Sequence, residues 1–194
     1  CCGHTFAAID GLLFIMQDAQ ITANDIANIA IATYGPAVSI TDRVDPKTPQ
    51  ECKFSMQYVL AHAAHYGSVR IEAFEAERMS DPAIQAMLGQ IDLSIDPAVD
   101  AEFPARRAAH VSVTKKDGRQ LTHYQPTRKG DPDLPLTDDE LDAKFIELAN
   151  PVLGNELTNS LLQKLWQLDE ISLATALDFA VLKRDHTAGK NLPN

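Results

Sequence analysis

The sequence predicts an α+β fold: a small antiparallel sheet with helices packed on one face, followed by helices at the C-terminal end. Asp117-Gly118 joins two segments of alternating apolar and polar residues, 109–114 and 120–125, and this pattern is typical of a β-hairpin. Residues 26–34 alternate isoleucine with small residues and end at Gly35-Pro36, which predicts another strand. Only helical patterns follow residue 135, so we expect the sheet to be complete by then.

Helical spacing of apolar residues indicates the remaining elements of the first part of the chain. It predicts a helix over 5–17, with Thr5 as N-cap, and a helix over 50–66 that stops at Gly67. A shorter helix is predicted over 80–91, where a proline falls in the first turn.

The C-terminal part shows a capping box, with Thr137 at the N-cap and Glu140 three residues later. It opens a predicted helix that runs to Asn150. Two more helices are predicted over 156–168 and 172–182, and the tail beyond them is expected to be loose.

Composition excludes several classes of protein. A net charge of −10 repels a phosphate backbone, so we expect no nucleic-acid partner. The longest apolar runs fall short of the ~20 residues that a spanning helix needs, so we expect no membrane segment. Three cysteines without C-x-x-C spacing favour reduced thiols and a cytoplasmic protein.

The first residues form a candidate site. Cys2, His4 and Thr5 precede a predicted helix, whose free N–H groups and positive dipole end favour an anion such as a carboxylate. The plainer alternative is that Cys1 and Cys2 are packing residues and that His4 caps a turn.

Arg43, Lys47 and Lys53 place three cations within eleven residues, which suits a polycarboxylate because arginine binds carboxylates bidentately. Equally, the two lysines could only solubilise an acidic domain. His62 and His65 lie three residues apart on a predicted helix but lack a third ligand at suitable spacing. We therefore expect surface histidines and no metal site.

No serine-hydrolase, P-loop, Rossmann or zincin motif is present. Three longer blocks are more informative: Cys1-Cys-Gly-His-Thr-Phe-Ala-Ala-Ile-Asp10, Arg43-Val-Asp-Pro-Lys-Thr-Pro-Gln-Glu-Cys-Lys-Phe-Ser55, and Lys129-Gly-Asp-Pro-Asp-Leu-Pro-Leu-Thr137. In order and spacing they resemble the MmgE/PrpD family, from residue 1 to about Leu168. Many family members have histidine where this chain has Phe6.

The resemblance implies the C-terminal domain of a two-domain enzyme whose all-helical N-terminal domain is absent from this sequence. Residues 1–20 would form a helix that packs with that domain, 21–135 a lid-like α+β domain, and 136–194 helices with a loose tail. The active site would lie between the domains, so we expect the fragment alone to be inactive. A homodimer is the implied assembly.

The resemblance also implies the chemistry. Relatives include 2-methylcitrate dehydratase, cis-aconitate decarboxylase and iminodisuccinate epimerase, which act on small polycarboxylates without metal or other cofactor. We expect a dehydratase of propionate metabolism in which His4 and Cys2 are catalytic; the expected substrate-binding residues are Arg43, Lys53, Thr5 and Tyr34. An epimerase or isomerase of a similar acid, and a non-catalytic binding module, remain alternatives.

Overall fold

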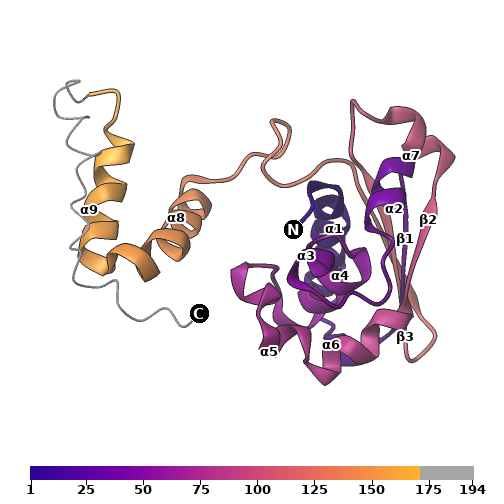
Figure 1. Ribbon diagram of the computed structural model, residues 1–194. Coiled ribbons are helices and arrows are strands. Elements are labelled where there is room, and N and C mark those ends of the chain that lie inside the picture. The colour runs from indigo at the N-terminus through magenta and orange to yellow at the C-terminus, as the bar shows by residue number, and fades with distance from the viewer. Residues whose placement is uncertain (171–194) are drawn as a thin grey trace. The chain divides into compact units, whose positions relative to one another are not determined.

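The computed structural model describes residues 1–170, and the chain divides into a first unit, Cys1–Pro135, and a second that begins at Leu136 (Figure 1). The first unit contains α1 (Phe6–Asp18), β1 (Ile26–Thr33), α2 (Gly35–Thr41), α3 (Pro49–Lys53), α4 (Met56–Tyr66), α5 (Ala76–Met79), α6 (Pro82–Met87), β2 (Ile91–Ile95), α7 (Pro97–Glu102), β3 (Ala109–Lys115) and β4 (Gln120–Gln125). Short 3-10 helices span Gly3–Thr5, Ala23–Asp25, Ile71–Phe74 and Leu88–Gln90. The second unit contains α8 (Asp138–Leu153) and α9 (Asn155–Trp166).

The strands form one four-stranded sheet in the order β2-β1-β3-β4. The α+β class and the hairpin of β3 and β4 are confirmed. The expectation of a purely antiparallel sheet is wrong, because β2 pairs with β1 in parallel, with Ile29 opposite Ile91. The helix predicted over 80–91 ends earlier, and the chain between β1 and β2 is long enough for the crossover that a parallel pair requires.

The core of the first unit lies between the sheet and α1 and α4, which Figure 1 shows on the same side of the strands. On that side Ile29, Ile31 and Val111 are fully buried. Ala30 and Ala32, which point to the opposite face of β1, are only partly buried. One-sided covering of this kind explains why β1 alternates large apolar with small residues.

The predicted helix over 50–66 is divided into α3 and α4. Ser55 interrupts it, because its hydroxyl accepts the Tyr58 N–H and starts a new helix. Gly67 ends α4 in the left-handed conformation with φ of 72°, as predicted. Thr5 precedes α1 but does not cap it through its side chain.

Helix α2 was not predicted, since Gly35-Pro36 was interpreted only as the end of a strand. Here the proline lies in the first helical turn, where its missing N–H costs nothing.

Among residues 1–170, no helix combines the length and the apolar composition that crossing a membrane requires.

In the second unit the predicted capping box is confirmed: the Thr137 hydroxyl accepts the Glu140 N–H, and the Glu140 carboxylate accepts the Thr137 N–H. Helix α9 matches the helix predicted over 156–168. The helix predicted over 172–182 lies outside the described residues. Thr158 is the only fully buried side chain of this unit's described part.

Candidate functional site

His4 and Tyr34 form a hydrogen-bonded pair near the start of α1. Tyr34 follows the last residue of β1, and the 3-10 helix that carries His4 packs against α2, so the two rings meet across thirty residues of sequence. His4 Nδ1 lies 2.8 Å from Tyr34 Oη. Phe103 stacks on the Tyr34 ring with centroids 4.7 Å apart, which fixes the ring against a second apolar cluster.

The surroundings keep both members of this pair neutral at pH 7. Burial lowers the pKa of His4, and the positive charges of Arg107 and Arg128 lower it further. Burial raises the pKa of Tyr34 to about 12; nearby Cys2 acts in the same direction, against the two arginines. In the tautomer in which Nδ1–H donates to the Tyr34 hydroxyl oxygen, Nε2 of the uncharged imidazole keeps its lone pair and can accept a proton.

Arg128 is held in place from two sides. Its guanidinium binds both carboxylate oxygens of Asp131, at 3.0 and 2.6 Å, and donates to the Gly3 carbonyl oxygen at 3.3 Å. The next residue is anchored as well, because the Lys129 N–H donates to the Asp10 carboxylate of α1 at 2.7 Å. The loop after β4 is therefore tied to the segment that carries His4.

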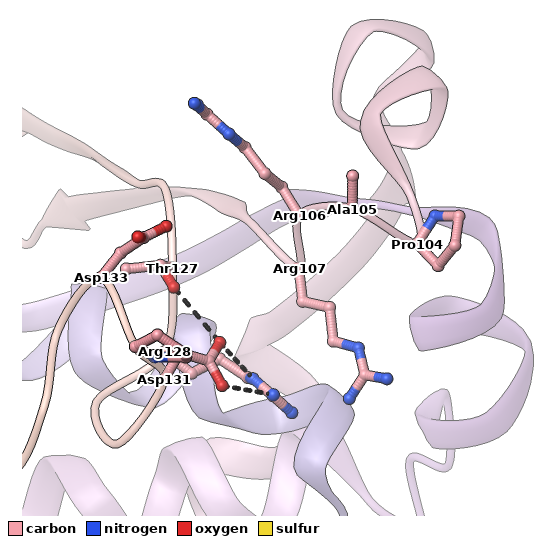
Figure 2. A pocket seen from close by; sticks show the side chains of 9 residues that line it. Pro104, Ala105, Arg106, Arg107, Thr127, Arg128, Asp131 and Asp133 are labelled. Atoms are coloured by element: carbon pink, nitrogen blue, oxygen red, sulfur yellow. Dashed lines mark hydrogen bonds and ion pairs between the residues drawn. The ribbon is translucent and has the colours of Figure 1, made fainter.

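A pocket of about 350 Å³ opens beside this loop, between residues 104–107 and residues 127–133 (Figure 2). In Figure 2 the guanidinium groups of Arg107 and Arg128 extend toward the same region, whereas the Arg106 side chain points away. Arg107 and Arg128 also act on the charge states of His4 and Tyr34. These two arginines therefore connect the pocket to the histidine–tyrosine pair.

Cys2, Thr5 and Lys53 lie around the same first turn, but the contacts are largely made by the backbone. The fully buried Thr5 hydroxyl donates to the Cys2 carbonyl oxygen at 2.8 Å. The Cys2 N–H donates to the Lys53 carbonyl oxygen at 2.8 Å. The Lys53 ammonium lies 5.6 Å from the centre of the Phe74 ring.

Arg43 is placed differently. Its guanidinium forms an ion pair with Glu51 at 3.5 Å, and it does not line the pocket in Figure 2. The structure thus brings together Cys2, His4 and Tyr34, whereas Arg43 is paired with Glu51 of α3. The positively charged residues near His4 are instead Arg107 and Arg128, which the sequence analysis did not select.

Sequence reasoning did not single out these two arginines. Arg107 is adjacent to Arg106 just before β3, and the sequence does not show which of the two faces a site. Arg128 immediately precedes the third family block. Arg128 could have been found from the sequence, because it is a basic residue directly before the third family block.

His62, predicted at the surface, is buried with 1% of its surface exposed. Its Nδ1 bonds to the Ser68 carbonyl oxygen at 2.8 Å, so it is a core residue of α4. Among residues 1–170 no group of three histidine, cysteine, aspartate or glutamate side chains is placed to hold a metal ion.

A neutral histidine–tyrosine pair beside guanidinium groups is an arrangement whose charges suit an anionic ligand. The sequence model of the MmgE/PrpD C-terminal domain matches residues 1–168, and the chain belongs to the MmgE/PrpD family.

Curated relatives include cis-aconitate decarboxylase of Mus musculus, 27% identical over 174 residues, which are 88% of this chain and 35% of that protein. Another is 2-methylcitrate dehydratase of Cupriavidus necator, 32% identical over 105 residues, which are 52% of this chain and 22% of that protein. The chain thus spans about a third or less of the length of these relatives.

Proposed function

We propose that this chain forms part of a lyase that removes a proton from a carbon next to a carboxylate of a small di- or tricarboxylic acid. The reaction that we place first is dehydration. The observation that carries the proposal is the neutral His4–Tyr34 pair, hydrogen bonded at 2.8 Å, beside the guanidinium groups of Arg107 and Arg128. Membership of the MmgE/PrpD family, and relatives that include dehydratases and decarboxylases, support it.

In this proposal His4 is the base. Its imidazole takes the proton, the electron pair left on carbon forms the double bond, and the hydroxyl group on the neighbouring carbon leaves as water after it is protonated. Tyr34 holds the imidazole ring through its hydroxyl group. The cations stabilise the negative charge that develops on the substrate carboxylate.

Cys2 is the second catalytic candidate, because its thiol is close enough to Tyr34 to influence the pKa of the phenol. It could supply the proton that the leaving hydroxyl group takes. Thr5, Lys53 and Arg43 stay predictions for substrate binding. No metal or other cofactor enters the proposed reaction.

Decarboxylation is the second candidate function. The mouse cis-aconitate decarboxylase aligns with 88% of this chain, a larger share than the 52% aligned with the C. necator dehydratase. In that case His4 would return a proton to the carbon that loses carbon dioxide, and the same cations would stabilise the charge on the intermediate.

The test uses the full-length protein that contains this chain. Purified protein is incubated separately with 2-methylcitrate, citrate, cis-aconitate and iminodisuccinate, and alkene absorbance, carbon dioxide release and proton exchange from deuterated water are followed. Alkene formation supports the dehydratase, and carbon dioxide release supports the decarboxylase. Exchange with inversion and no other product would instead indicate an epimerase, and inactivity toward all four acids would contradict the proposal.

A further inference from the structure

We propose that Arg107 is a specificity-determining residue: its guanidinium binds a substrate carboxylate in the pocket beside the His4–Tyr34 pair, with Arg128 as the fixed wall of that pocket. This assignment rests on the proposed function, because it names the part of the same site that recognises the substrate. It replaces neither His4 nor Tyr34, which lie at the reacting end.

Arg107 is the cation of this pocket that is available to a ligand. Its guanidinium forms no hydrogen bond or ion pair with any of residues 1–170. Arg128, by contrast, is committed to Asp131 and to the Gly3 carbonyl oxygen. An arginine has five N–H donors in a planar fork, so a partly buried guanidinium without a protein partner suits a carboxylate.

The position of Arg107 relates the pocket to the reacting groups. The pocket-lining segment that carries Arg107 directly follows Phe103, whose ring centre lies 4.7 Å from that of Tyr34 and 6.3 Å from that of His4. On the other side of the pocket, Arg128 donates to the carbonyl oxygen of Gly3, the residue before His4. The pocket volume of about 350 Å³ is in the range that accommodates small ligands. A molecule with one carboxylate on Arg107 could therefore present a second part of itself to His4.

The acidic residues of the pocket limit what it can bind. Asp131 neutralises Arg128, and Asp133 also lines the pocket. A neutral or cationic ligand would not be attracted by the Arg107 charge. A small anion without further groups would be repelled by the carboxylates of Asp131 and Asp133. The preferred ligand is one whose carboxylate reaches the guanidinium while its other carboxylates extend away from the aspartates.

The neighbouring Arg106 provides a matched control. It belongs to the same segment and lines the same pocket, but its side chain points away in Figure 2, and it pairs with Glu102 at 3.8 Å. Replacement of either arginine changes the net charge equally. Only replacement of Arg107 should change recognition of the ligand.

The experiment measures binding of tricarballylate to the full-length protein by calorimetry. Tricarballylate has three carboxylates but neither hydroxyl group nor double bond, so it cannot be dehydrated. We expect Arg107→Gln to weaken binding about 10- to 100-fold, as loss of a charge-assisted, bidentate contact should do. Arg107→Lys should recover part of the affinity, and Arg106→Gln should leave it unchanged.

Turnover provides the second measurement. With the accepted substrate, Arg107→Gln should raise KM more than it lowers kcat. The acid limb of the kcat/KM profile should move to higher pH, because removal of a nearby positive charge raises the pKa of His4. If Arg107 only stabilised the fold, Arg107→Gln would lower the melting midpoint and the acid limb of the kcat/KM profile would stay at the same pH.

The outcomes separate the two proposals. Weaker tricarballylate binding by the Arg107 variants supports the inference even if no tested acid is turned over, a result that would reject only the proposed function. Unchanged KM and unchanged tricarballylate affinity in Arg107→Gln would overturn the inference, and an active enzyme would then leave the proposed function standing. Absence of tricarballylate binding by the wild type would also overturn the inference.

Discussion

At the scale of single residues, His4 and His62 share a lowered pKa, and in both the largest cause is burial, which disfavours a charged imidazole. Two guanidinium groups add to the effect at His4. His62 instead lies in the core, where its Nε2 has no hydrogen-bond partner among residues 1–170. In the proposed function the neutral His4 accepts a proton, whereas His62 is a packing residue of the core.

His62 should make the stability of the chain depend on pH. Because its pKa is lower in the folded than in the unfolded state, the unfolded chain binds a proton first as pH falls through about 6.5. Stability should therefore be fully present at pH 7.5 and decline toward pH 5.5. Urea unfolding of wild type and His62→Gln at both pH values checks this.

We expect a smaller loss between those pH values in His62→Gln, since glutamine does not titrate. His110→Gln is the control, because His110 is an exposed residue of β3. Equal pH dependence in wild type and His62→Gln would show that the buried imidazole does not contribute.

At the scale of elements, α1 packs closely on β3 through a glycine. A Cβ atom at Gly11 would lie 2.8 Å from Cγ2 of Val111, whose side chain is fully buried. The same helix carries Asp10, which holds the loop after β4 through the Lys129 N–H. One turn of α1 thus determines both the helix–sheet distance and the position of Arg128.

Gly11→Ala should destabilise the chain although alanine favours helices. The helix gains about 1 kcal/mol from the exchange, but overpacking against a buried strand typically costs about 1–3 kcal/mol. The melting midpoint should fall. Gly89→Ala is the control, since nothing lies within 4 Å of its added Cβ, and a higher midpoint for Gly11→Ala would reject this description of the contact.

Asp10→Ala should release the loop that carries Arg128. It leaves the Lys129 N–H without this acceptor, at a cost of about 1–3 kcal/mol if the group stays buried. We expect faster tryptic cleavage at Arg128 and Lys129 and a lower kcat/KM in the full-length protein. Asp10→Asn keeps a carbonyl acceptor and removes a charge that burial disfavours, so it should behave like wild type. Equal cleavage of the alanine and asparagine variants would contradict the anchoring role.

Elements with local signals were predictable from sequence, and elements that depend on distant pairing were not. The β3–β4 hairpin and the Thr137 cap are specified by a few neighbouring residues, and both were predicted. Strand β2 follows a helix closely and pairs with β1 more than sixty residues away, so no local pattern identifies it as parallel. The split between α3 and α4 needed one serine hydroxyl to be recognised as a cap.

At the scale of the whole molecule, the two units differ in what they bury. All the fully buried apolar residues of the described part lie in the first unit. The second unit exposes a larger set of apolar side chains: Leu141, Ile146, Leu148, Val152, Leu157, Leu165, Trp166 and Leu168. Residues 1–135 thus have a core of their own, whereas residues 136–170 contain exposed apolar side chains and no buried apolar residue.

Removal of residues 136–194 should therefore leave a folded protein. We expect residues 1–135 to melt cooperatively, at a midpoint close to that of the whole chain, and to bind less hydrophobic dye. Calorimetry and dye fluorescence on both chains provide the comparison. Loss of the cooperative transition, or undiminished dye binding, would contradict the division into units.

The candidate site was only partly predictable from sequence, because its residues are far apart in the chain and come together only in the folded structure. The first turn and its histidine were recognisable from the residues before α1, and Tyr34 was predicted only as a substrate-binding residue. Arg107 and Arg128 come from loops next to β3 and β4, and only the folded sheet brings them to His4. Arg43 and Lys53 were selected for their spacing in sequence, which does not specify which cations face the imidazole.

The most direct test of this account is the ratio of kcat/KM between wild type and His4→Gln in the full-length protein, measured with the acid that the enzyme accepts, across pH 5 to 8. We expect a fall of about 10²- to 10⁴-fold with an unchanged melting midpoint, as loss of a positioned base should cause. The wild-type profile should have an acid limb below pH 6.5, because the pKa of His4 is lowered, and this limb should disappear in the variant. An unchanged rate, or a lost rate accompanied by a collapsed midpoint, would contradict a catalytic His4.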